Sequence, residues 1–111
     1  MMSKKIRVIH LDSVNRHIHE LMIDNTLSAL QELVGGYIER VPGSSNECSI
    51  WCDEEGLIKG LEYGFLWPSY PNPIAGNGVI TGVSKNGDTK SVGIKLEDVD
   101  VMFWVADKEN K

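Results

Sequence analysis

The chain has 111 residues and a formal net charge of −5, with 41% hydrophobic and 24% charged residues. This length holds one modest core and is too short for two, and the composition is that of a folded globular protein. We therefore expect a single domain over residues 1–111. The lysines and arginines are dispersed along an acidic chain, so direct binding to nucleic acid is not expected.

No apolar run approaches the roughly 20 residues of a membrane span, and the first residues lack the pattern of a cleaved signal. We expect a cytoplasmic protein without a membrane partner. The acidic residues cluster loosely, around residues 53–55 and 97–100. Such a surface usually keeps a protein soluble, and it can also imitate a phosphate backbone.

The N-terminal part predicts a hairpin that leads into a helix. Residues 5–11 and 17–23 favour two strands, with turn residues between them. Residues 26–34 favour a helix capped by Asn25, with Leu27, Leu30 and Val34 on one face. The pair Gly35-Gly36 predicts the end of this helix, with one glycine at positive φ.

A second hairpin is expected from residues 37–41 and 47–53, joined by the polar loop 42–46. On its second strand, alternation places Cys48, Ile50 and Cys52 on one face. A short extension at residues 57–61 follows a turn. Further on, residues 76–83 and 89–94 predict another hairpin, in which Asn86-Gly87 favours a type I′ turn.

Residues 61–73 interrupt the regular pattern. They hold four of the eight aromatic residues and three of the four prolines. Because proline removes a backbone donor, this segment is not expected to form a central strand. Its rings either cap the sheet or bind a partner, and the sequence leaves both open.

The C-terminal segment, residues 96–106, carries two competing periods. Leu96, Val99 and Phe103 recur at helical spacing, whereas Val99, Val101 and Phe103 alternate as in a strand. We favour a helix. The fold expected from the whole chain is α+β, a mostly antiparallel sheet of hairpins packed by one central short helix and a C-terminal helix.

The sequence contains no group of residues that specifies a reaction. A zinc site from Cys48 and Cys52 with two of His10, His17 and His19 has poor spacing and is not favoured. A cysteine nucleophile would need an activating base that the sequence does not reveal. We therefore expect no catalytic residues, no metal, no cofactor and no enzyme activity.

The aromatic segment offers a better candidate for binding. Tyrosine, tryptophan and asparagine near a basic residue can stack on a planar ring and bind its edge or a phosphate. The expected ligand-binding residues are Tyr37, Arg40, Tyr63, Trp67, Tyr70 and Asn72.

The chain also resembles a family of small uncharacterised proteins from bacteriophages and bacterial mobile elements, known only as a domain of unknown function. The resemblance rests on residues 24–39, which contain Leu-Gln-Glu-Leu-Val-Gly-Gly-Tyr-Ile-Glu, and more loosely on residues 54–61, 73–76 and 96–99. The family usually carries an Asn-Arg pair after Gly60-Leu61, where this chain has Glu62-Tyr63. No role of that pair is carried over.

What the resemblance implies is a small α+β protein from a phage-like genome. Proteins of that origin often counter host defence, and some sequester nucleotide immune signals in pockets at subunit boundaries. We therefore expect a non-catalytic homo-oligomeric protein that sequesters a small nucleotide-like signal in the host cytoplasm. The alternative is an acidic inhibitor of a host defence protein, acting through nucleic-acid mimicry or an aromatic anchor.

Overall fold

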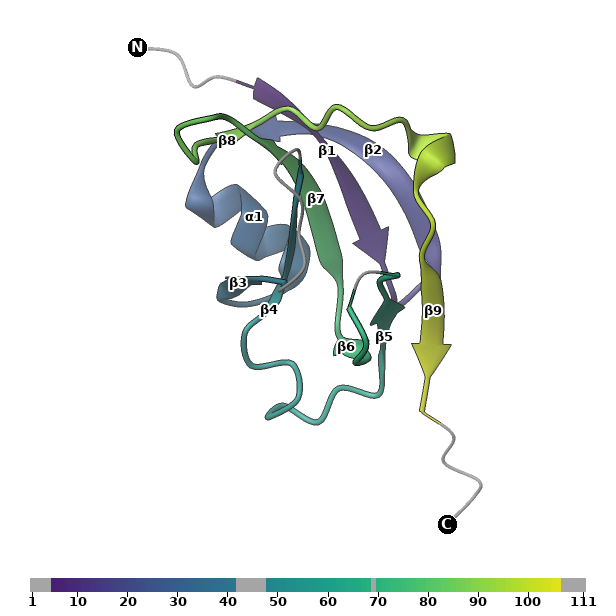
Figure 1. Ribbon diagram of the computed structural model, residues 1–111. Coiled ribbons are helices and arrows are strands. Elements are labelled where there is room, and N and C mark those ends of the chain that lie inside the picture. The colour runs from purple at the N-terminus through teal and green to yellow at the C-terminus, as the bar shows by residue number, and fades with distance from the viewer. Residues whose placement is uncertain (1–4, 42–47, 69, 107–111) are drawn as a thin grey trace.

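The computed structural model describes residues 5–41, 48–68 and 70–106. Over these residues it consists of two antiparallel sheets and one α-helix (Figure 1). The large sheet has the order β2-β1-β7-β4-β3, with β8 paired to β7, and the small sheet has the order β6-β5-β9. The strands of the large sheet are β1 Lys5–Asp12, β2 His17–Asp24, β3 Ile38–Arg40, β4 Cys48–Asp53, β7 Gly78–Val83 and β8 Thr89–Lys90. Those of the small sheet are β5 Tyr63–Leu66, β6 Ile74–Ala75 and β9 Met102–Val105, and the helices are α1 Leu27–Val34 and the 3-10 turn η1 Leu96–Asp98.

The expected hairpins and the central helix are thus present. The loop 42–46, expected to join β3 to β4, and Glu47, expected to begin the second strand, lie outside the described residues.

Helix α1 covers one face of the large sheet. Along β1, alternation turns Ile6 and Val8 toward the helix, where they pack with Leu30, Val34 and Val79 in one buried cluster. At eight residues, α1 is too short to persist alone, so this apolar contact holds it in place.

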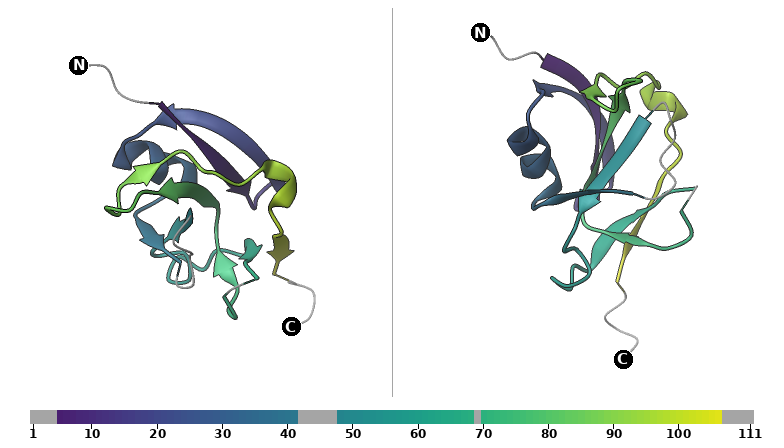
Figure 2. Two further views of the ribbon diagram at one scale, coloured as in Figure 1. Left: turned by 45° about the horizontal axis from the view of Figure 1, so that its top comes forward. Right: turned by 60° about the vertical axis from the view of Figure 1, so that its left-hand side comes forward.

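The small sheet lies over the opposite face of the large sheet, as the right-hand view of Figure 2 shows. Here the alternate β1 residues Ile9 and Leu11 pack with Ile50 of β4 and with Phe65 of β5. Phe65 has no exposed surface. As expected, Cys48, Ile50 and Cys52 share this buried face.

The start of α1 differs from the expectation by one residue. Thr26, not Asn25, is the N-cap, and its hydroxyl oxygen accepts from the backbone N–H of Ala29 at 3.2 Å. Asn25 instead donates through its side chain to the carbonyl of Thr89 at 3.0 Å. Leu27, which was expected on the apolar face, is 60% exposed, and Leu30 and Val34 are the buried residues of α1.

The double glycine ends α1 as expected, and a different physical constraint favours glycine at each of the two positions. Gly35 adopts φ +94°, and its N–H bonds the Gln31 carbonyl at 2.7 Å. A Cβ on Gly36 would lie 2.8 Å from Nζ of Lys59. That lysine pairs with the buried carboxylate of Asp53 at 2.7 Å, so Gly36 leaves room for an ion pair at the end of the helix.

The prediction of a C-terminal helix is wrong. Residues 96–98 form only η1, and Met102–Val105 forms strand β9 beside β5. Leu96, Val99, Val101 and Phe103 all pack on the core cluster, so the pairing of β9 with β5, and not this packing, selects the strand. High β-branched content favours this outcome, since Val loses side-chain freedom in a helix.

The prediction that residues 61–73 hold no central strand is also wrong. Strand β5 lies between β6 and β9. The three prolines of the segment all follow Leu66, so they remove no donor from β5. The expected extension at residues 57–61 is a run of turns.

The β7–β8 hairpin forms with a different turn and a shorter second strand than expected. The N–H of Gly87 bonds the Ser84 carbonyl at 2.9 Å, with Gly87 at φ +88°. Among the described non-glycine residues only Arg16 has positive φ, which excludes a type I′ turn at Asn86. The N–H of Ser84 bonds the Asp88 carbonyl at 2.8 Å, so a three-residue loop, 85–87, that ends in a left-handed glycine takes its place.

Candidate functional site

An open groove of about 1110 Å³ lies at the end of the large sheet where the β7–β8 hairpin meets the start of β1. In Figure 1 this is the upper end of the molecule, near β8. Four cationic side chains line it, from Lys5, Arg40, Lys85 and Lys90, and no Asp or Glu is among its described lining residues. In a chain with a net charge of −5, this is a local concentration of positive charge.

The four cations come from separate elements and differ in their partners. Lys5 forms an exposed ion pair with Asp24 at 2.9 Å, and Nε of Arg40 donates to the Ser49 hydroxyl at 2.9 Å. Within the described part of the chain, Lys85 at the hairpin and Lys90 on β8 make no ion pair. These two lysines are exposed and available to an anion.

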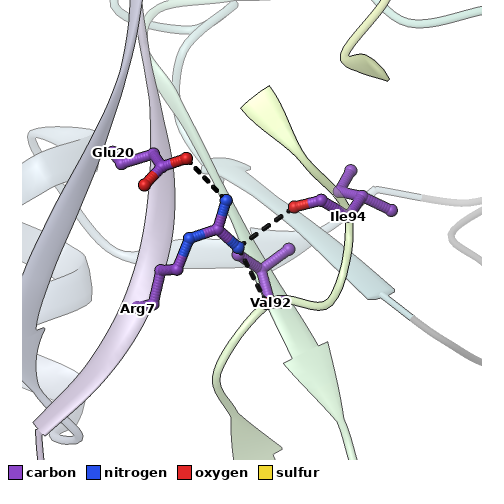
Figure 3. A network of polar contacts seen from close by, with 4 residues as sticks. All are labelled: Arg7, Glu20, Val92 and Ile94. Atoms are coloured by element: carbon purple, nitrogen blue, oxygen red, sulfur yellow. Dashed lines mark hydrogen bonds and ion pairs between the residues drawn. The ribbon is translucent and has the colours of Figure 1, made fainter. Parts of the chain in front are cut away.

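Arg7 holds the segment after β8, of which Ser91, Gly93 and Ile94 line the groove. Figure 3 shows the contacts of its side chain. Its Nη1 donates to the carbonyls of Val92 and Ile94 at 2.9 and 3.0 Å. Its Nη2 pairs with Glu20 at 2.7 Å, and this bond raises the pKa of Arg7 and lowers that of Glu20. The backbone of Arg7 also bonds Ser91 and Val92 at 2.9 Å each. The segment after β8 is thereby held to β1 without an ordinary strand pairing.

The six expected binding residues do not converge on this groove. Arg40 lines it. Tyr37 follows α1 and is 65% exposed, Tyr63 lies on β5 opposite Val105, and Asn72 is exposed in a turn.

Trp67 and Tyr70 are the two expected binding residues that lie close together. The Tyr70 N–H bonds the Trp67 carbonyl at 3.0 Å. Both rings pack against the core cluster that contains Phe65. Their contacts are those of a lid over the core, and they leave less ring surface for a ligand than the sequence suggested.

The three histidines come together, but not with the cysteines. The alternation of β1 places His10 on the face of α1, whereas Cys48 and Cys52 lie in the core on the other face. The large sheet therefore separates the two residue types that a combined zinc site would need to bring together. Among the residues described, no group of three or more His, Cys, Asp and Glu side chains is arranged to hold a metal ion.

Cys48 and Cys52 are both buried free thiols. Burial, with smaller contributions from the charges of Glu39 and Asp53, raises the pKa of Cys52 to about 11. The thiolate is the nucleophilic form, so at neutral pH Cys52 is a poor nucleophile.

Fold and site together define a small protein of antiparallel sheets and one helix with a basic groove on an otherwise acidic chain. The chain belongs to the family described as Domain of unknown function (DUF3846), whose model matches residues 6–103. No curated protein and no solved structure matches the chain. In the described part of the chain, no helix is long and apolar enough to cross a membrane.

Proposed function

We propose that this protein is a non-catalytic binding protein that sequesters a small, nucleotide-like anion in the basic groove. The observation that carries the proposal is the pair of exposed lysines, Lys85 and Lys90, which line the groove and make no ion pair in the described part of the chain. The groove has a volume of about 1110 Å³, slightly above the roughly 300–1,000 Å³ of ordinary ligand sites, so it has room for a nucleotide-sized ligand.

The chemistry of the lining favours the phosphate part of such a ligand. A lysine ammonium binds phosphate as a point charge, and an arginine can add two parallel hydrogen bonds. No aromatic residue is among the described residues that line the groove. We therefore propose that charge, rather than ring stacking, supplies most of the binding energy.

The biological setting is part of the proposal and rests on the resemblance to phage and mobile-element proteins. There the ligand would be a nucleotide signal of bacterial immunity in the host cytoplasm, and binding without cleavage would silence it. A homo-oligomer is proposed as well. It is supported by the exposed apolar pair Leu66 and Met102, which lie opposite each other on the small sheet, where β9 is an edge strand.

The test is a binding screen with the purified protein. Cyclic nucleotides, ADP-ribose derivatives and pyrophosphate are tested by thermal shift and calorimetry, because a ligand that binds only the folded state raises Tm. Bound ligand is then released by heating and identified by mass spectrometry. We expect release of the intact compound, and a cleaved product would contradict a non-catalytic role.

Two variants connect binding to the groove. The double variant Lys85→Gln/Lys90→Gln removes the two exposed groove charges and should weaken binding at least tenfold. Lys95→Gln is the matched control, since Lys95 is exposed and does not line the groove. Failure of every compound to bind, or equal loss in both variants, would contradict the proposal.

A protein partner is the second candidate, favoured by a different surface. Leu57 and Ile58 are 79% and 85% exposed in the turn beside Glu54 and Glu55. The N–H of Glu54 bonds the Tyr37 carbonyl at 2.8 Å, so the exposed Tyr37 is near this turn. An apolar tip with acidic neighbours suits an inhibitor that binds a basic protein surface.

The tip variant Leu57→Ser/Ile58→Ser separates the two candidates. If the partner is a protein, the wild type should recover it from host lysate and the tip variant should not. The groove variant Lys85→Gln/Lys90→Gln should recover it like the wild type. An acidic contact also weakens as ionic strength rises.

A further inference from the structure

Strand β9 is an edge strand that lacks the features by which proteins usually protect such an edge. Within the described residues it pairs with β5 alone, and in Figure 1 it runs along the right-hand side of the molecule. Its sequence, Met-Phe-Trp-Val, contains no charged residue and no proline. Unpaired strand edges readily pair with another strand, and charges, prolines or a very short strand normally prevent this.

The other strands at the ends of the two sheets carry these protective features. Strand β3 has three residues, of which Glu39 and Arg40 are charged. Strands β6 and β8 have two residues each, and β6 directly follows Pro73. Strand β2 is longer, but Glu20 and Asp24 place charges on it. Among the described strands, β9 is therefore the edge best suited to accept another strand.

The hydrogen bonds of β5 show which way its backbone groups point. The N–H of Ala106 bonds the Glu62 carbonyl at 2.7 Å, so Glu62 faces the side of β9. The N–H of Gly76 bonds the carbonyl of the next residue, Tyr63, at 2.7 Å, so Tyr63 faces the side of β6. The direction alternates from residue to residue along an antiparallel strand.

This alternation identifies the outward groups of β9. Met102 lies opposite Leu66 and Trp104 lies opposite Gly64, and these pairs share the phase of the bond from Ala106, so their backbone groups face β5. The N–H and C=O groups of Phe103 and Val105 therefore point away from the small sheet. Continuing the same alternation, Val101 also presents its backbone groups outward.

The side chains along this edge are apolar and partly exposed. Met102 and Val105 are 66% and 58% exposed, and Leu66, opposite Met102, is 36% exposed. No charged residue lies between Asp100 and Asp107 in the sequence. Two copies of a chain with net charge −5 repel each other, so an uncharged apolar strip is where they approach at the lowest electrostatic cost.

We propose that β9 is the contact surface for a second copy of this chain. The two β9 strands pair antiparallel across a two-fold axis at Phe103, which joins two three-stranded small sheets into one continuous sheet. Phe103 then lies opposite Phe103 of the partner, and Val101 lies opposite Val105 of the partner. Each outward N–H meets a C=O group, and Asp100 lies opposite Ala106 rather than another acid.

This contact specifies the homo-oligomer that is part of the proposed function, and it is separate from the basic groove, which no β9 residue lines. The pairing spans only residues 101–105 of each copy. Such a contact is at or below the low end of the roughly 1,200–2,000 Å² that stable interfaces bury, so we expect a dissociation constant in the micromolar range.

The test is analytical ultracentrifugation of the full chain from micromolar to millimolar concentration. We expect an equilibrium between monomer and dimer. Val105→Glu places like charges beside the two-fold axis and should weaken the dimer at least tenfold. Val14→Glu is the matched control, because Val14 is 57% exposed in the β1–β2 turn and the charge changes equally. Met102→Glu and its control Met22→Glu, at 66% and 63% exposure, repeat the comparison.

NMR on a mixture of labelled and unlabelled protein locates the contact. We expect contacts between Val101 of one copy and Val105 of the other. A chain that stays monomeric at millimolar concentration would overturn the surface, and so would a dimer that Val105→Glu and Val14→Glu weaken equally. Anion binding is measured separately: Val105→Glu should retain it, and Lys85→Gln/Lys90→Gln should retain the dimer. A failure of this contact is thereby distinguished from a failure of the groove.

Discussion

The aromatic segment and the basic groove lie at different ends of the molecule and do opposite things with their side chains. In residues 61–73 the large rings turn inward, with Phe65 fully buried and Trp67 and Tyr70 packed on the same core. At the groove, Lys85 and Lys90 turn outward. In this chain the cluster of rings covers the core, and the proposed binding surface is instead the cationic groove.

The largest expected effect falls on the aromatic segment. Phe65→Ala should destabilise the protein by about 3–5 kcal/mol, because it removes a fully buried ring between the two sheets. Denaturant unfolding measures this loss. Leu66→Ala is the control, since the neighbouring Leu66 is 36% exposed and should cost far less. Equal losses would mean that the small sheet does not pack on the large one as described.

The buried thiol gives the next largest effect. Because the pKa of Cys52 rises from 9.0 to about 11, its thiolate fraction at pH 8 falls about a hundredfold, and burial slows reaction further. Iodoacetamide at pH 8 should therefore label Cys52 only after denaturation. The unfolded thiol ionises at lower pH than the folded one, so this residue lowers stability as pH rises through 9 to 11. Fast labelling of the native protein would contradict a buried, protonated Cys52.

The double glycine predicts an intermediate loss of stability. Gly35→Ala places a side chain at φ +94°, and Gly36→Ala pushes against the ion pair of Lys59 and Asp53. Each should cost roughly 1 kcal/mol or more in thermal unfolding. Gly93→Ala is the control, because Gly93 has no positive φ and open space around its Cβ position. Unchanged stability in both variants would refute the proposed end of α1.

The groove lysines should have the smallest effect on stability. Lys85→Gln/Lys90→Gln removes exposed charges that form no ion pair in the described structure, so unfolding should shift by no more than about 0.5 kcal/mol. Circular dichroism melts measure this. A large loss would show that the two lysines support the fold. The double variant could then no longer separate a loss of binding from a loss of stability.

Local patterns predicted most of the large sheet. Strand-favouring residues between turn signals identified β1, β2, β4 and β7, and Gly35-Gly36 identified the end of α1. The three strands of the small sheet, β5, β6 and β9, were missed. Residues 96–106 fit both periods, and only the pairing of β9 with β5 selects the strand. In residues 61–73, the number of prolines argued against a strand, although all three prolines follow Leu66, the last residue of β5.

The groove could not be predicted, because its cations are far apart in sequence. Lys5, Arg40 and Lys90 meet only through the order of strands in the large sheet. The grouping of the three histidines had a partial signal, since His17 and His19 share a face of one strand. The contact with His10 depends on the register of the hairpin, which the sequence does not reveal.

The central claim is that the groove binds an anion by charge, and one calorimetric experiment tests it most directly. The tightest compound from the nucleotide screen is titrated into the wild type and into Lys85→Gln/Lys90→Gln at increasing ionic strength. We expect the wild-type affinity to fall with added salt and the variant to bind at least tenfold more weakly at low salt. Equal affinities that do not depend on salt would contradict the claim.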